Sequence, residues 1–164
     1  MFQLTFPGHY ASSCTGHPLA DIPGEEQDED ALGVKIAAQR RLHYELGIKP
    51  EQIPVNDIFY LTRIYHCDRG NGKWGDHAIV YILIVQQDFT LKANSNELSE
   101  LSFIPQGQFY EHLRELKVPL EPILNLVLTR NMLNLWWKNL DDLNSIKNHN
   151  DVIRLDEKCN EFMK

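Results

Sequence analysis

The chain has 164 residues, 43% of them hydrophobic, and a formal net charge of -7 at pH 7. This length is enough for one domain with its own hydrophobic core, so neither disulfides nor a structural metal is required for folding. Its acidic residues are scattered and no basic stripe is present, which argues against DNA or RNA as a partner. No stretch approaches the ~20 apolar residues of a membrane span, which excludes a membrane-spanning helix.

The cellular compartment is predicted from the ends of the chain and from its cysteines. The amino terminus shows no basic leader, and Cys14, Cys67 and Cys159 are an odd, sparse set that fits reduced thiols better than a disulfide framework. The carboxyl terminus, Phe162-Met163-Lys164, is not a peroxisomal address. We therefore expect a cytoplasmic protein.

The first strong element is an amphipathic helix from about Asp28 to Leu46. Apolar residues with helical spacing would line one of its faces. They are Leu32, Ile36, Ala37, Leu42 and Leu46. Asp28 or Asp30 is a candidate N-cap, and Gly47 can take the left-handed conformation that ends a helix.

Two strands follow, at 58–65 and 77–85, because both segments are rich in β-branched and aromatic residues. The intervening residues 69–76 contain the glycines and the asparagine of a hairpin loop, which predicts antiparallel neighbours. A third, shorter strand is expected near 101–104. The fold class predicted is therefore a mixed α/β (α+β) domain.

After Pro105 the spacing of the apolar residues becomes helical. A helix is predicted from Phe109 to Leu116 and a longer one from Leu120 to Trp137, which together would form a helical cap on the sheet. From Ser145 onward the chain is polar and unpatterned and is expected to fray. We therefore divide the chain into one domain, residues 1–146, and a polar tail, residues 147–164. Residues 4–18 at the start of the domain contain the prolines and glycines of loops, with no strand or helix before them. We therefore expect the start of the fold to be missing.

Three groups of residues are candidates for chemistry. His9, Cys14 and His17 lie close together but match no standard zinc spacing, so a polar loop with a buried thiol is the simpler interpretation. His66-Cys67 and Asp76-His77 flank the hairpin loop, where a solvated tip is the alternative to a site.

Arg41 and Glu45, the third group, stand four residues apart on one helix face. A surface ion pair of roughly 0.3–0.5 kcal/mol explains them most simply. The functional alternative is a carboxylate that holds Mg²⁺ against a diphosphate while the arginine binds a phosphate oxygen.

Several motifs resemble those of eukaryotic type I isopentenyl diphosphate isomerase, in the same order, from about residue 4 to residue 146. They are Thr5-Phe6-Pro7-Gly8, Ser13-Cys14-Thr15-Gly16-His17-Pro18-Leu19, Ala31-Leu32-Gly33-Val34, Ala37-Ala38-Gln39-Arg40-Arg41-Leu42, Glu45-Leu46-Gly47-Ile48, Tyr60-Leu61-Thr62-Arg63-Ile64, Trp74-Gly75-Asp76-His77 and Trp136-Trp137. The resemblance implies a Nudix-type fold and the interconversion of isopentenyl and dimethylallyl diphosphate through a tertiary carbocation. It also implies Mg²⁺ on the diphosphate and a second divalent metal on His and Glu ligands.

The metal and substrate positions of the family are partly kept. His17 matches the metal-ligand histidine of the Cys-x-His-Pro loop, with Mg²⁺, Mn²⁺ or Zn²⁺ as its ion, and Glu45 matches the acid on the diphosphate-bound Mg²⁺. Asp76 stands where the family has the first glutamate of a Glu-x-Glu pair. Gly16, Arg41 and Leu120 take the substrate-binding positions.

The catalytic positions are replaced. The family's cysteine falls on Thr15, with Cys14 one place earlier as a weak substitute that an extended loop would aim elsewhere. The second glutamate of the pair falls on Ala78, and the tyrosine position on His66. The tryptophan that shields the cation falls on Leu120, which offers no π face. A threonine hydroxyl is a far weaker acid than a thiol of pKa about 8.5.

The family also takes two further metal-ligand histidines and diphosphate-binding basic residues from a segment before the Thr-Phe-Pro-Gly motif. Without that segment, metal binding would be weakened and an open sheet edge would permit self-association. Two functions are weighed. One is an isomerase with weak or lost turnover, and the other is a non-catalytic relative that binds an isoprenoid diphosphate or a protein partner. A Nudix pyrophosphohydrolase is disfavoured because Leu32, Arg41 and Tyr44 replace the acids that such a box needs, leaving Glu45 alone.

Overall fold

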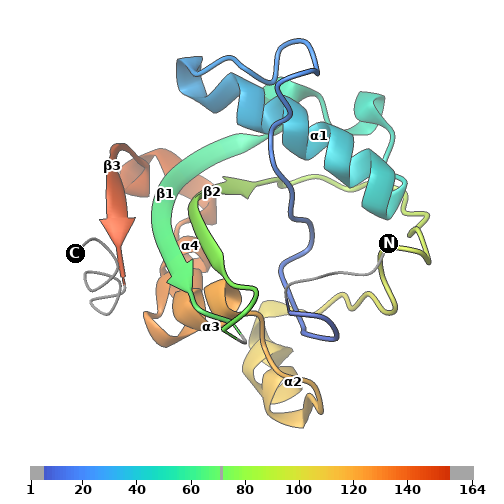
Figure 1. The fold of residues 1–164 in the computed structure, drawn as a ribbon, viewed down its shortest axis with the longest axis vertical. Helices are drawn as coiled ribbons and strands as arrows, with labels where there is room; N and C mark the ends of the chain where they lie inside the picture. Colours follow the sequence, from blue (N-terminus) through green and yellow to red (C-terminus); the bar gives the residue numbers. More distant parts are fainter. Residues whose placement is uncertain (1–5, 71, 156–164) are drawn as a thin grey trace.

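The computed structural model describes residues 6–70 and 72–155. Figure 1 shows a strongly curved hairpin of β1 and β2 at the centre, with α1 beyond one end of it and the later helices near the other. The helices are α1 (Leu32–Leu46), α2 (Phe109–Glu115), α3 (Pro122–Thr129) and α4 (Met132–Lys138). The strands are β1 (Phe59–Asp68), β2 (Asp76–Ile84) and β3 (Asn148–Arg154). Short 3-10 helices occupy Glu29–Ala31, Pro50–Gln52, Val55–Asp57, Gln106–Gln108 and Leu140–Ile146.

Helix α1 confirms the predicted helix and its C-terminal glycine. Gly47 has a φ of 66°, and its N–H donates to the carbonyl of His43, 3.0 Å away. The start differs from the prediction, because neither Asp28 nor Asp30 makes a side-chain cap and the helix begins after Ala31 with a φ of 56°. The carboxylate of Asp30 is bound instead by the ammonium groups of Lys35 and Lys147, at 2.6 and 3.0 Å.

The predicted hairpin is confirmed. β1 and β2 pair antiparallel, in a register that sets His66 opposite Ala78 and Asp68 opposite Asp76. This register brings the polar residues at the two ends of the loop together. Within the described residues β2 forms one edge of the sheet, so self-association through an open edge stays a prediction.

The expected fraying after Ser145 is wrong for residues 148–154, which form β3. This strand pairs parallel to β1 and completes the strand order β2-β1-β3. The residues of β3 are mostly polar, so the sequence did not indicate a strand. The strand is held to β1 by its backbone pairing and by the guanidinium of Arg63, which donates to the carbonyls of His149 and Asn150 at 3.1 and 3.2 Å. The side chain of β1 thus binds the backbone of β3 where the pairing register shifts.

Two other expectations are wrong. Residues 101–104 form no strand, and Phe103 is 76% exposed, so the segment has no sheet partner to bury it. The single helix predicted from Leu120 to Trp137 is two helices, because Asn131 takes a left-handed φ of 57° between α3 and α4. The predicted helix at Phe109 is confirmed as α2.

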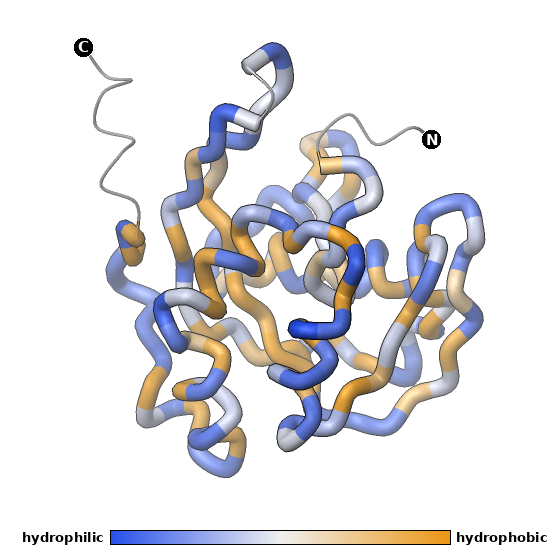
Figure 2. Tube along the Cα trace, turned by 90° about the horizontal axis from the view of Figure 1, so that it is seen from below, coloured by the Kyte–Doolittle hydropathy of each residue, from blue (hydrophilic) through white to orange (hydrophobic). Residues whose placement is uncertain are grey.

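The core consists of two apolar clusters on opposite sides of the hairpin. One joins Leu61 and Ile64 of β1 to Val127 of α3 and Trp136 of α4, and the other joins Leu46 of α1 to residues 48–58. Neighbouring residues of β2 pack against different clusters, as expected where side chains alternate between faces. Figure 2 shows these hydrophobic stretches along the central strands, with hydrophilic loops around them. The mixed α/β class is therefore confirmed.

No helix in the described part of the chain is long and apolar enough to cross a membrane.

Candidate functional site

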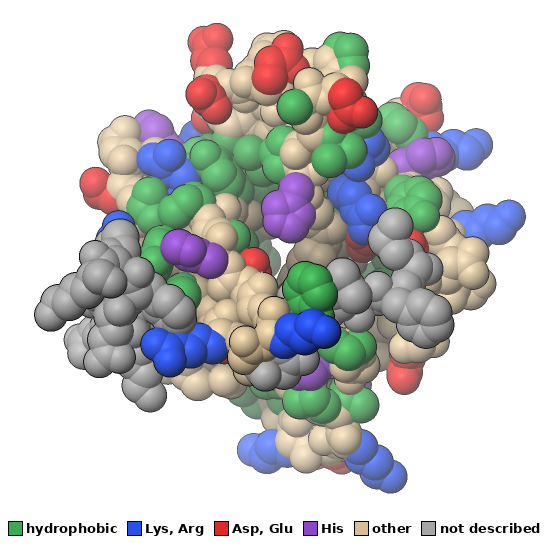
Figure 3. All heavy atoms as spheres, viewed as in Figure 1, with side chains coloured by type: hydrophobic (Ala, Val, Ile, Leu, Met, Phe, Trp, Pro, Cys, Tyr) green, Lys and Arg blue, Asp and Glu red, His purple; other side chains and the backbone are tan. Residues whose placement is uncertain are grey.

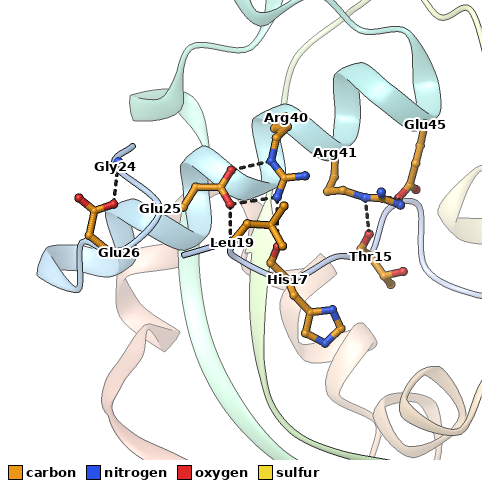
Figure 4. Close-up of polar contacts among 9 residues, drawn as sticks. All are labelled: Thr15, His17, Leu19, Gly24, Glu25, Glu26, Arg40, Arg41 and Glu45. Atoms are coloured by element: carbon orange, nitrogen blue, oxygen red, sulfur yellow. Dashed lines mark hydrogen bonds and ion pairs between the residues drawn. The ribbon is translucent and has the colours of Figure 1, made fainter. Parts of the chain in front are cut away.

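The loop at residues 14–17 runs along α1 and is fastened to it by two arginines (Figure 4). Nε of Arg41 donates to the carbonyl of Thr15 at 3.2 Å, and Nη2 of Arg40 donates to the carbonyl of His17 at 3.1 Å. Figure 4 shows the side chains of Thr15 and His17 pointing away from α1. This agrees with extended backbone, in which residues two apart share a side.

A buried ion pair holds this arrangement. The carboxylate of Glu25 accepts from Nε and Nη2 of Arg40, at 2.6 and 2.9 Å, and from the backbone N–H of Leu19 at 2.8 Å. The Glu25 side chain is fully buried, and its bond from the guanidinium holds the pKa of the carboxyl below its ordinary value. Sequence reasoning missed this pair because fifteen residues separate its members.

Glu45 lies where the helix end meets the loop. Its side chain is 7% exposed, and burial raises the pKa of the carboxyl while the neighbouring Arg41 opposes that rise. The guanidinium of Arg41 binds this carboxylate through Nε, at 2.8 Å, and through Nη2. It also lies 3.6 Å from a carboxylate oxygen of Glu97. Arg41 therefore stands as a resident cation between two carboxylates.

Cys14 faces this same pair. Its thiol is hydrogen-bonded to Glu45, and burial together with the negative charge of Glu45 raises the pKa of the thiol to about 12. The expectation that Cys14 and Thr15 point in different directions therefore fits the geometry, with Cys14 toward α1 and Thr15 away from it. A thiol with this pKa is a poor source of thiolate at neutral pH.

The other substrate positions have structural explanations of their own. A Cβ on Gly16 would lie 2.5 Å from Cγ of Arg41, so the loop can approach the helix this closely only with glycine there. Leu120 is half-buried and forms a parallel β-bridge with Tyr10. Their roles in binding substrate stay predictions.

A second polar group lies at the end of the hairpin. His66 is 2% exposed, neither of its ring nitrogens has a hydrogen-bond partner among the described residues, and Nε2 lies 3.9 Å from a carboxylate oxygen of Asp76. Ala78 is opposite His66 and offers no polar group. A pocket of about 520 Å³ opens beside them, lined on this side by Cys67, Asp76 and His77.

Figure 3 shows a hollow near the middle of the face that Figure 1 presents, with histidine and acidic side chains at its rim. Among residues 6–70 and 72–155, no group of three or more His, Cys, Asp and Glu side chains is arranged to hold a metal ion. His17, Glu45 and Asp76 are thus not assembled into one ligand set. A single carboxylate is a ligand that Mg²⁺ accepts, since this ion commonly takes one or two carboxylates and completes its shell with substrate phosphates and water. The role of Glu45 as such a ligand stays a prediction.

Sequence reasoning also missed Glu121. It lies between Leu120 and the start of α3, it is half-buried, and its Oε2 is buried without a hydrogen-bond partner in the described structure. Burial and the nearby charge of Asp76 raise the pKa of its carboxyl. In the sequence, an acid directly before a proline is typical of the start of a helix, so Glu121 carried no functional signal.

Comparison with known proteins places the chain. Residues 8–126 match the NUDIX domain. The chain is 38% identical over 156 residues to isopentenyl-diphosphate Delta-isomerase 1 of Mesocricetus auratus, covering 93% of this chain and 68% of that protein. It is 40% identical over 144 residues to isopentenyl-diphosphate delta-isomerase 2 of Homo sapiens, covering 86% and 63%.

These matches, with the mixed sheet and its helices, define a NUDIX-domain protein. The identity to the isomerases extends over nearly the whole chain, as it does for the 35% identical isomerase of Dictyostelium discoideum. The chain belongs to the isopentenyl-diphosphate Delta-isomerase family, as the motifs indicated.

Proposed function

We propose that the chain binds isopentenyl and dimethylallyl diphosphate and interconverts them slowly. The observation that carries this proposal is the buried carboxylate of Glu45, which lies at the end of α1 and contacts the loop that contains Cys14. The chain that carries it belongs to the isomerase family. A bound Mg²⁺ would supply electrostatic stabilisation of the diphosphate.

Arg41 and Glu45 would act together when the diphosphate enters. The side chain of Arg41 is 26% exposed, and its guanidinium can turn from the carboxylate to a phosphate oxygen, for which its planar geometry is suited. Glu45 is then free to accept the cation in place of Arg41. The exchange replaces one positive partner by another, so the buried carboxylate is never left without a counter-charge.

Slow turnover is the consequence of the replaced positions. Thr15 offers a hydroxyl whose side chain points away from α1, and Ala78 offers no ionisable group. Positioned general acid and base groups typically contribute ~10²–10⁴-fold each, so losing the usual pair reduces the rate steeply.

The alternative is a protein that binds the diphosphates without converting them. The observation that favours it is the pairing of Ala78 with His66, because the residue opposite the buried histidine then carries no carboxyl. Both readings share the diphosphate site at Glu45 and differ in turnover alone.

One experiment separates them. The chain is incubated with isopentenyl diphosphate and Mg²⁺ in D₂O, and NMR follows deuterium entry and dimethylallyl product. We expect slow but measurable exchange. Binding by calorimetry without any exchange would establish the non-catalytic alternative, and the absence of binding would refute the proposal.

A further inference from the structure

The segment that follows β2 is fastened to the last turn of α1, whose C-terminal end it passes in Figure 1. The backbone N–H of Asn94 donates to the carbonyl of Glu45 at 2.8 Å. Four residues later, the side chain of Leu98 packs against the apolar cluster that contains Leu46. Glu97 lies between these two anchors, so folding fixes its backbone beside the end of α1 that carries the candidate site.

The side chain of Glu97 reaches Arg41. Its Oε2 lies 3.6 Å from Nη2 of Arg41, and the two side chains are 18% and 26% exposed. This distance is longer than a hydrogen bond, so the contact is a charge attraction that water, salt or a competing anion can weaken. Nε of Arg41, by contrast, donates to the carboxylate of Glu45 at 2.8 Å. Arg41 is therefore bound tightly by one carboxylate and loosely by the other.

Glu97 is not required to hold Arg41 in place. Nε of Arg41 also donates to the carbonyl of Thr15 at 3.2 Å, and the guanidinium lies 5.2 Å from the centre of the Tyr44 ring. An ion pair that is open to solvent adds little to the free energy of unfolding. The carboxylate of Glu97 also places a like charge near the buried Glu45, which is unfavourable. Stability therefore does not account for an acid at position 97.

We propose that Glu97 is a further residue of the diphosphate site, where its carboxylate competes with the ligand for Arg41. The inference rests on the proposed function, in which Arg41 turns to a phosphate oxygen. Carboxylate and phosphate oxygens bind the N–H groups of a guanidinium in the same planar geometry, so the incoming phosphate group displaces Glu97. Glu97 then moves into water. The fraction of the free protein in which Glu97 has already released Arg41 sets the apparent affinity for the diphosphate.

This competition has two measurable consequences. Replacement of Glu97 by glutamine removes the competitor and one negative charge beside the diphosphate, so the ligand should bind more tightly. The gain should become smaller as the salt concentration rises, because salt screens the attraction between exposed charges over about 10 Å at 0.1 M. A residue that only orders the segment predicts the opposite, an affinity that stays the same or decreases when the residue is replaced.

The test compares Glu97→Gln with Glu100→Gln, which changes an exposed acid three residues further along the same segment. Isopentenyl diphosphate is titrated into the wild type and both variants by calorimetry, with Mg²⁺ present, at low and at high salt. We expect Glu97→Gln to lower the dissociation constant at least threefold at low salt and to match the wild type at high salt. Glu100→Gln should match the wild type at both. The midpoints of urea unfolding should be the same for the two variants.

The possible outcomes separate the two proposals. An unchanged or larger dissociation constant for Glu97→Gln, or an equal gain in Glu100→Gln, overturns the role of Glu97 and leaves the proposed function standing. A gain that does not decrease with salt also overturns this role. Absence of binding by the wild type and by both variants overturns both proposals. If Glu97→Gln does not fold by circular dichroism, Glu97→Ala must show the same gain at low salt in a folded protein.

Discussion

Replacement of Glu25 by glutamine removes the charge from the buried pair that fastens the loop to α1. The wild-type carboxylate accepts two hydrogen bonds from Arg40 and one from the backbone of Leu19, and it has no exposed surface. Breaking a buried ion pair typically costs 3–5 kcal/mol. Arg40 is 28% exposed and can turn to water, so we expect a loss at the lower end, about 3 kcal/mol.

The measurement is urea denaturation at pH 7, read as the free energy of unfolding. For a domain of this size, a loss of about 3 kcal/mol corresponds to a fall in Tm of about 6–12 °C. Glu26→Gln is the matched control, because Glu26 is the exposed neighbour and, among residues 6–70 and 72–155, its carboxylate accepts one hydrogen bond, from the N–H of Gly24. It should change the stability by less than about 0.5 kcal/mol. Equal stabilities for the two variants would refute the assignment of Glu25–Arg40 as the ion pair that holds the loop to α1.

Three further predictions follow from the same contacts. The folded pKa of Glu25 is below its ordinary 4.5, so the stabilisation by its carboxylate is present above that pH and is lost as the pH falls. The difference in free energy of unfolding between the wild type and Glu25→Gln should therefore decrease below about pH 4.5. A difference that does not change with pH would contradict this. Burial is the larger cause of the raised pKa of Cys14 and remains in Glu45→Gln, but this variant removes the second cause, the negative charge, and leaves Arg41 beside the thiol. Alkylation of Cys14 at pH 8, measured by mass spectrometry, should therefore accelerate by about tenfold, and an unchanged rate would count against the contact. Gly16→Ala places a Cβ 2.5 Å from Arg41, so urea denaturation should show a loss of about 1–3 kcal/mol, whereas wild-type stability would mean that the loop lies farther from α1.

The local elements of the fold could be predicted from the sequence. The helix at Leu32–Leu46 and the hairpin carry their own periodicity and turn residues, and both are confirmed. The strand at 148–154 could not be predicted because its pairing partner is β1, whose Arg63 lies 86 residues before His149 in the chain. The break between α3 and α4 depends on one left-handed residue, Asn131, inside an otherwise continuous apolar pattern.

In the candidate site, too, contacts between neighbours in the sequence could be predicted and contacts between distant residues could not. Arg41 and Glu45 are one helical turn apart, so spacing alone predicted their contact, which the structure confirms. Glu25 and Glu121 have no signal in local spacing, because fifteen residues separate Glu25 from Arg40 and because Glu121 meets Tyr10 from the far side of the chain. The roles of Thr15 and the other motif positions in chemistry stay predictions.

The most direct test of the account is the Mg²⁺ dependence of diphosphate binding. Isopentenyl diphosphate is titrated into the wild type, Glu45→Gln and the exposed control Glu51→Gln by calorimetry, with Mg²⁺ or with EDTA. We predict that Mg²⁺ tightens binding at least tenfold for the wild type and for Glu51→Gln, and that Glu45→Gln loses this dependence. Equal affinity with Mg²⁺ and with EDTA in the wild type, or an undiminished Mg²⁺ effect in Glu45→Gln, would contradict the account.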